Sequence, residues 1–251
     1  MKRFIKAWLD RRPAPPAPEL PMDGPLCALP LVLPLAEARR VMVFAPHPDD
    51  ESIGCGGLLA LLARAGVPTR VVLVSDGSGA GGLPEGAGEV RQQEFRAALA
   101  RLGIGDMALL GFPDGELALS PALLAAIAQE VRDFSPQWVF TPASIDLHRD
   151  HRVVAEAVRQ AALAVASVET VWQYETWSPL PITHVLDITG MLATKLAALG
   201  EHRTALACGN YLLGTEGLSR HRALLLGAPK PDGAAEGYLA TQRAALFMPA
   251  R

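Results

Sequence analysis

The feature that most constrains the fold of this chain is the recurrence of short, largely apolar runs of strand length. These runs alternate with longer Leu- and Ala-rich stretches of helix length. The strand runs are 41–45, 69–74, 107–110 and 138–141, and the helix stretches are 53–65, 89–102, 121–134 and 151–166. Strands that are apolar throughout belong to parallel sheets covered by helices on both faces. The alternation therefore predicts an α/β protein, an open Rossmann-like three-layer sandwich with a mostly parallel sheet.

The pattern changes on both sides of this predicted α/β core, which we assign to residues 40–168. Residues 1–12 are basic, with apolar side chains at helical spacing, and they predict either an amphipathic segment on a membrane or partner, or a loosely ordered tail. Residues 13–39 are rich in proline, which disfavours helix and interior strand, so we expect a linker or surface wrap. Residues 169–251 are expected to be a smaller extension of the same domain that shapes the substrate pocket.

Within this C-terminal part, residues 171–177 and 184–188 are expected to be extended, and a helix is expected from Met191 towards Arg203. The segment after Cys208 is rich in Gly and Ala and predicts only mixed structure. The oligomeric state is left open by the sequence.

Composition narrows the class of protein. Its 23 basic and 26 acidic residues give a formal net charge of −3, without the basic surplus that nucleic-acid binding uses. No apolar run reaches the roughly 18–20 residues of a membrane-spanning helix. The cysteines, Cys27, Cys55 and Cys208, are too few and too scattered for a disulfide framework or a Cys-ligated zinc site. We therefore expect a cytoplasmic protein, with peripheral membrane contact through residues 1–12 as an open alternative.

A polar motif follows the first strand: Pro46-His47-Pro48-Asp49-Asp50-Glu51. Three consecutive carboxylates repel one another unless a cation neutralises them. His47 and Asp50 could supply an imidazole nitrogen and a carboxylate oxygen to one metal ion, which would leave Asp49 free beside it. An acidic helix start that complements the helix dipole is the plainer interpretation of this motif taken alone.

A second polar motif, His148-Arg149-Asp150-His151, opens the helix after the fourth strand. His148 and His151 are three residues apart and face the same side of a helical turn. Loops at the carboxyl ends of parallel strands meet at the ligand-binding edge of the sheet. Together the two motifs offer three ligands and an open fourth position, the arrangement of a catalytic zinc site. The isolated His184, His202 and His221 are expected to be solvated or in the core.

The paired motifs resemble those of the PIG-L/LmbE-like family of zinc-dependent N-acetylglucosaminyl deacetylases. The resemblance covers residues 41–188 and includes Ser75-Asp76-Gly77 and Gly111-Phe112-Pro113-Asp114-Gly115. It implies an enzyme that hydrolyses the acetamide of an N-acetylated amino sugar or glycoconjugate. The implied cofactor is Zn²⁺, with another divalent metal as an alternative.

The resemblance also implies roles for single residues. The metal ligands would be His47, Asp50 and His151, and Asp49 would be the general base. A protonated His148, held by Asp150, would face the carbonyl oxygen of the substrate. These roles suit the chemistry, because zinc lowers the pKa of its bound water to about 7 and a nearby carboxylate can take the proton.

The resemblance also suggests Arg91 as a sugar contact, and Asp114 is a further candidate. Trp177 is expected either to be a stacking face for a sugar or to lie in the core or an interface. Relatives carry a lysine and then a Ser-Gln pair late in the chain. Here Lys195 is present, but the later stretch reads Glu201-His202-Arg203-Thr204-Ala205. This departure bears on which substrate the protein binds more than on which reaction it catalyses.

Two alternatives stay open. Residues 77–82 fit G-x-G-x-x-G, which would suit a nucleotide- or S-adenosylmethionine-binding protein, although Pro84, Gly86 and Gly88 delay the helix that such a site requires. A non-catalytic, metal-stabilised sugar-binding module would keep the metal ligands but could dispense with Asp49.

Overall fold

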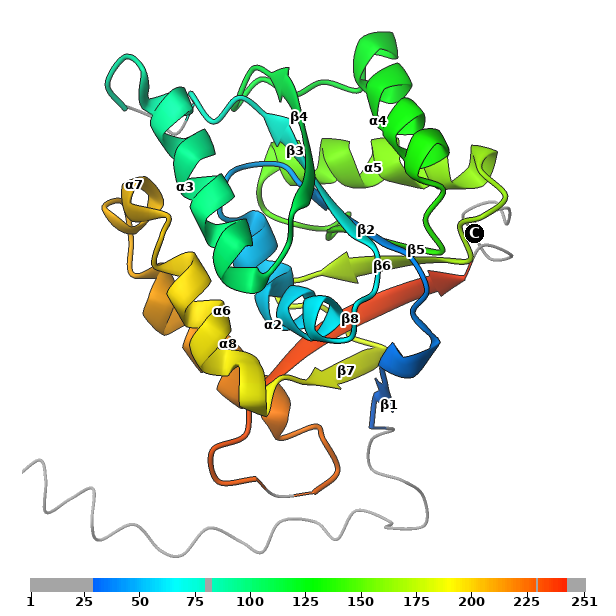
Figure 1. Cartoon of the computed structure of the whole chain (residues 1–251), viewed down its shortest axis with the longest axis vertical. Coiled ribbons are helices and arrows are strands. Elements are labelled where there is room, and N and C mark those ends of the chain that lie inside the picture. The colour runs from blue at the N-terminus through cyan, green and yellow to red at the C-terminus, as the bar shows by residue number, and fades with distance from the viewer. Residues whose placement is uncertain (1–28, 80–82, 229, 243–251) are drawn as a thin grey trace, which may run out of the picture.

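The computed structural model describes residues 29–79, 83–228 and 230–242. The described residues form one mixed sheet of eight strands with helices on both faces (Figure 1). The strands are β1 (Leu31–Val32), β2 (Val41–Ala45), β3 (Thr69–Ser75), β4 (Asp106–Phe112), β5 (Trp138–Pro142), β6 (Thr170–Tyr174), β7 (His184–Asp187) and β8 (Ala235–Gln242). The helices are α2 (Asp50–Arg64), α3 (Ala87–Leu102), α4 (Pro121–Phe134), α5 (Arg149–Ala164), α6 (Leu192–Leu199), α7 (Arg203–Leu206) and α8 (Tyr211–Ala223), with short 3₁₀ turns at η1 (Leu35–Glu37) and η2 (Thr189–Met191).

The strand order is β1-β7-β8-β6-β5-β2-β3-β4, and the pairs are parallel except where β8 lies antiparallel between β6 and β7. Helices α2, α3 and α6 cover one face, and α4 and α5 cover the other (Figure 1). This arrangement confirms the predicted three-layer α/β fold with a mostly parallel sheet.

Strand β2 is apolar throughout because both of its faces are buried. Val41, Val43 and Ala45 point into the core shared with α2 and α3, whereas Met42 and Phe44 point into the core under α4 and α5. Successive side chains of a strand face opposite sides, so a strand covered on both faces must be apolar throughout. Its neighbours β3 and β5 hold it in the middle of the sheet.

The glycines of α2 allow the helix to approach the sheet closely. A Cβ added to Gly54 would lie 2.1 Å from Cδ2 of Tyr174. Tyr174 is fully buried, and its hydroxyl donates to the backbone oxygen of Phe44 at 2.8 Å, so its ring has little freedom to move. Helix α2 therefore requires glycine at this position.

Gly54→Ala is expected to lower the free energy of unfolding by about 2 kcal/mol or more, because the added methyl overpacks the core. Gly217→Ala is the matched control, since no described atom outside its own stretch of α8 lies within 4 Å of its added Cβ. That substitution should raise stability by roughly 0.5–1 kcal/mol through helix propensity. Urea denaturation measures both variants, and equal stabilities would contradict the close packing of α2.

The C-terminal part differs from expectation in two places. The helix predicted from Met191 towards Arg203 is split into α6 and α7, because Gly200 ends α6 and His202 adopts a non-helical conformation. The mixed segment after Cys208 contains α8 and the inner strand β8. Because β8 reads AEGYLATQ, it has neither a continuous apolar run nor a clear alternation that would predict a strand.

Residues 1–12, and with them the predicted membrane contact, lie outside the described residues. Of the proline-rich segment 13–39, the described part begins at residue 29 and contributes β1, which pairs in parallel with β7 at the sheet edge. Within the described residues, no helix combines the length and apolar character needed to cross a membrane.

Candidate active site

The candidate site lies where β2 and β5 end side by side. Strand β2 continues to β3 on one side, and the chain later returns to place β5 on the other side, so the strand order reverses at this point. Ligands of open α/β sheets bind at such a switch point, outside the carboxyl ends of the strands. A pocket enclosing about 580 Å³, part of it open to solvent, opens here.

Three potential ligand atoms converge beside this pocket, which His47 and Asp50 line. His47 Nδ1 lies 3.3 Å from Asp50 Oδ2, His151 Nε2 lies 3.2 Å from the same oxygen, and the two nitrogens are 3.3 Å apart. Nitrogen and oxygen ligands about 2.0–2.1 Å from a tetrahedral zinc ion are separated from one another by about 3.3 Å. The triangle of His47, Asp50 and His151 therefore fits a single divalent cation.

The remaining ring nitrogens of these histidines face carboxylates. His47 Nε2 lies 3.2 Å from Asp114 Oδ1 and 3.3 Å from Asp150 Oδ2, and His151 Nδ1 lies 3.4 Å from Asp146 Oδ1. Metal-binding histidines usually have such a partner, which fixes the ring and its tautomer. Both the triangle and the carboxylates around it therefore suit a metal site.

The charges around the triangle are negative. Burial alone would lower the pKa of His151, but Asp50 and Asp146 outweigh it and raise that pKa to about 9. The pKa of His47 is also raised despite burial, by Asp114, Asp150 and Asp50. An environment that favours added protons so strongly also attracts a divalent cation.

Asp49 stands beside the triangle and lines the pocket. It precedes the first residue of α2 but makes no side-chain capping hydrogen bond. Burial raises the pKa of Asp49 to about 7, with a further contribution from the carboxylate of Asp50 and opposition from His202 and Arg91. A carboxylate with a pKa near 7 has the proton affinity that a general base needs, and a bound cation nearby would lower that pKa.

His148 is the N-cap of α5, and its Nδ1 accepts a hydrogen bond from the backbone N–H of Asp150 at 3.2 Å. The neutral ring then carries its proton on Nε2. Burial lowers the pKa of His148, and His47 and His151 lower it further. A neutral His148 would therefore offer its Nε2–H as a donor, and the protonated ring implied by the resemblance stays a prediction.

Asp150 contacts His148 through its backbone N–H, and its side chain contacts His47. Its Oδ2 lies 3.3 Å from His47 Nε2 and accepts from the backbone N–H of Gly115 at 2.9 Å. The backbone N–H of Asp150 thus helps to orient the His148 ring, which also contacts the rings of His47 and His151.

Arg91 and Asp114 line the pocket together, with Arg91 Nη1 2.9 Å from Asp114 Oδ2. The guanidinium also donates to the backbone oxygens of Gly77 at 3.0 Å and Pro48 at 3.2 Å. Arg91 is thus largely engaged in holding three loops together. Its closest approach to Asp49 is 3.8 Å, from Nη2 to Oδ2.

Trp177 is 43% exposed and lines the same pocket, and its ring meets that of Tyr211 edge to face with centroids 5.3 Å apart. Tyr211 and Cys208 also line the pocket and are not among the site residues predicted from the sequence. Both residues belong to the segment from Cys208 onward, for which the sequence predicts only mixed structure. Neither is spaced from another candidate residue in a way that would have indicated a site.

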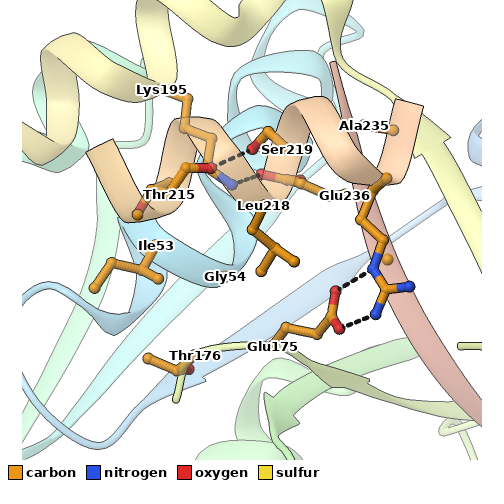
Figure 2. Close-up of a pocket in the computed structure, with 13 residues that line it drawn as sticks. Ile53, Gly54, Glu175, Thr176, Lys195, Thr215, Leu218, Ser219, Ala235 and Glu236 are labelled. Carbon is orange, nitrogen blue, oxygen red and sulfur yellow. Dashed lines mark hydrogen bonds and ion pairs between the residues drawn. The ribbon is translucent and has the colours of Figure 1, made fainter. Parts of the chain in front are cut away.

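A second cavity lies beside α2 and is lined by buried ion pairs (Figure 2). Lys195 Nζ lies 2.6 Å from Glu236 Oε1, and Arg222 Nε lies 2.9 Å from Glu175 Oε2. None of the described residues that line this cavity also lines the catalytic pocket. Its charges are paired with one another and join α6, α8 and β8 to the rest of the fold.

Comparison with known proteins finds relatives over the part of the chain that contains this site. The profile of the PIG-L family, described as GlcNAc-PI de-N-acetylase, matches residues 42–162, which contain both histidine motifs. A 1D-myo-inositol 2-acetamido-2-deoxy-alpha-D-glucopyranoside deacetylase of Kineococcus radiotolerans is 30% identical, with 68% of this chain and 70% of that protein aligned. A 2'-N-acetylparomamine deacetylase of Streptomyces fradiae is 33% identical, but the chain spans only about half of that relative, 52% of its length.

Solved structures share the fold. A conserved protein of Thermus thermophilus is 28% identical, with a TM-score of 0.71 over 80% of this chain and 94% of that one. The hydratase GalB of Pseudomonas putida has a TM-score of 0.68 at 20% identity, over 85% and 98% of the two chains, which shows a common fold alone. Together with the relatives above, these findings confirm the family resemblance: the chain belongs to the PIG-L/LmbE-like family of deacetylases.

Proposed function

We propose that this protein is a divalent-metal-dependent hydrolase that removes the acetyl group from an N-acetylated amino sugar or glycoconjugate. The observation that carries the proposal is the triangle of His47 Nδ1, Asp50 Oδ2 and His151 Nε2. Beside it lies the carboxylate of Asp49, which makes no capping hydrogen bond to α2. Zinc is the proposed metal, because two imidazoles, one carboxylate and an open position are typical of catalytic zinc sites.

When bound, a divalent cation would acidify a water molecule and polarise the acyl oxygen of the substrate. Asp49 accepts a proton from the attacking water while the water oxygen adds to the acyl carbon. The C–N bond then breaks, a proton passes to the nitrogen, and the products are acetate and a free amine. The Nε2–H of His148 donates to the acyl oxygen as negative charge develops there.

His148→Gln is expected to lower kcat by about 10²- to 10³-fold, because one donor to the developing oxyanion is lost. Metal content should stay unchanged, since His148 is not part of the triangle. The measurements are steady-state kinetics and elemental analysis. Loss of the metal would instead make His148 a ligand, and His184→Gln, at the start of β7, is the control that should keep kcat within about twofold.

The pocket favours a sugar as the group that carries the acetamide. The exposed ring of Trp177 and the partly buried ring of Tyr211 supply an apolar face, and the Arg91–Asp114 pair supplies polar atoms to the same pocket. We propose these residues as the substrate contacts. The identity of the sugar depends on the segment from Thr204 to Tyr211, which lines the pocket.

The experiment that tests this function is an amine-release assay of the metal-loaded protein over N-acetylated sugars, nucleotide sugars and lipid-linked glycans. We expect equimolar acetate and amine from at least one of these classes. Absence of release from the whole panel would contradict the proposal. The assay is needed because a fold hosts several chemistries, as the likeness to a hydratase illustrates.

The nucleotide-binding alternative fits the structure poorly. Helix α3 begins at Ala87, ten residues after Gly77, so its N-terminus does not follow the glycine motif directly. Gly79 packs instead against the backbone of Asp114, where an added Cβ would lie 2.1 Å from the carbonyl oxygen. The described part of the glycine-rich loop thus borders the catalytic pocket.

A further inference from the structure

A buried ion pair lies directly behind Asp49. Nε2 of His202 is 2.8 Å from Oε1 of Glu51, and the two residues are 1% and 0% exposed. Glu51 belongs to the acidic motif after β2, whereas His202 comes from the turn between α6 and α7, 151 residues later in the chain. A carboxylate buried this deeply needs a partner, and His202 supplies it.

The other oxygen of Glu51 reaches the backbone of the proposed base. Glu51 Oε2 accepts a hydrogen bond from the N–H of Asp49 at 3.2 Å, and Oε1 accepts from Ser52 Oγ at 2.6 Å. Asp49 has φ +136° and ψ −28°, a conformation that non-glycine residues rarely adopt. Strained backbone of this kind persists at functional sites only where the surroundings hold it.

We infer that His202 and Glu51 are positioning residues that hold the strained backbone of Asp49 and thereby aim its carboxylate at the attacking water. The inference rests on the proposed function. His202 acts through Glu51, and Glu51 acts through the Asp49 N–H, so neither residue has to touch the substrate. The pair also ties the pocket-lining segment after α6 to the catalytic loop.

The fold contains a matched control for a purely structural role. Lys195 and Glu236 form another buried pair against α2, at 2.6 Å, in the second cavity (Figure 2). Glu236 accepts from the backbone N–H groups of Gly57 at 2.7 Å and Leu58 at 2.8 Å, two turns beyond Asp49. Loss of this pair should disturb α2 without changing the conformation of Asp49.

The test compares His202→Gln, Glu51→Ala, Glu51→Gln and Lys195→Met in the metal-loaded full chain. We expect His202→Gln and Glu51→Ala to lower kcat by about 10- to 100-fold, because misplacement of a catalytic group by about 1 Å costs that much. KM should stay within about twofold, and one metal ion per chain should remain. Glu51→Gln keeps an oxygen for the Asp49 N–H and should recover part of kcat, whereas Lys195→Met should keep kcat within about twofold.

Two further measurements separate positioning from general damage. In an Asp49→Asn background, His202→Gln should cause no further loss of the residual rate, because its effect passes through Asp49. Amide hydrogen exchange at Asp49 should become faster in His202→Gln and Glu51→Ala but not in Lys195→Met. This exchange needs no substrate, so it tests the inference even if the wild-type protein releases no amine and the proposed function fails.

An unchanged kcat in both His202→Gln and Glu51→Ala would overturn the inference. An equal fold-loss from His202→Gln in the wild-type and Asp49→Asn backgrounds, or unchanged Asp49 exchange in both variants, would overturn it as well. Should Glu51→Ala fail to fold, the His202→Gln kinetics and exchange decide the outcome alone.

Discussion

Asp49→Asn is expected to retain one metal ion per chain and to lose about 10²- to 10⁴-fold in kcat. Asparagine has the shape of aspartate and tolerates positive φ, so it should keep the backbone at φ +136°. It lacks the second carboxylate oxygen and cannot accept a proton from the attacking water. The triangle of His47, Asp50 and His151 is unchanged, so the metal should stay bound.

The measurements for Asp49→Asn are kcat, KM and metal content on the same preparation. The control is Asp106→Asn at the start of β4. The carboxylate of Asp106 is exposed, pairs with Arg70 and is far along the chain from the acidic motif. That variant should behave like the wild-type protein. A near-normal rate for Asp49→Asn would remove Asp49 as the base, and loss of the metal would make it a ligand.

His151→Ala is expected to abolish both metal binding and measurable turnover. His151 is fully buried, and its Nε2 is 3.2–3.3 Å from the other two ligand atoms, so its removal opens the triangle. Removal of one ligand from a set of three leaves too few for tight binding. Without the cation, the attack of water on an amide loses its main source of activation.

Chelation of the wild-type protein should have the same effect on turnover, but the effect should be reversible. Added Zn²⁺ should restore activity to the chelated wild type and not to His151→Ala. Metal loading should also raise the melting temperature of the wild type, because a ligand that binds only the folded state stabilises it. A chelated, metal-free protein with full activity would refute the metal-dependent mechanism.

The fold and the two motifs could be predicted because their signals are local. An apolar run such as Val41–Ala45 has a single stable place, a central strand covered on both faces. The acidic motif follows that strand directly, and His151 lies in the first turn of the helix after β5, so both reach the same sheet edge. Spacing along the chain was enough to associate these residues with one ion.

The rest of the site depends on contacts between distant segments. His202 has no acidic neighbour in sequence at ligand spacing, yet it meets Glu51 because α6 ends at Gly200 and the chain turns back towards α2. Tyr211 meets Trp177 only because α8 begins beside the loop after β6. Such contacts leave no periodic pattern in the sequence.

Asp150 shows a different limit of prediction from spacing. The family resemblance implies that Asp150 holds His148, and the structure has the backbone N–H of Asp150 donate to His148 Nδ1 at 3.2 Å. The carboxylate faces His47 and the backbone N–H of Gly115. Which atoms of Asp150 meet which partner therefore depends on the three-dimensional path of the helix, which spacing along the chain does not give.

The most direct test of the metal site is a crystal structure of the protein loaded with one equivalent of Zn²⁺, with anomalous data collected at the zinc edge. We predict one anomalous peak, about 2.0–2.1 Å from His47 Nδ1, Asp50 Oδ2 and His151 Nε2, with Asp49 outside the coordination sphere. A zinc ion held by other side chains, or one coordinated by the Asp49 carboxylate, would contradict the account.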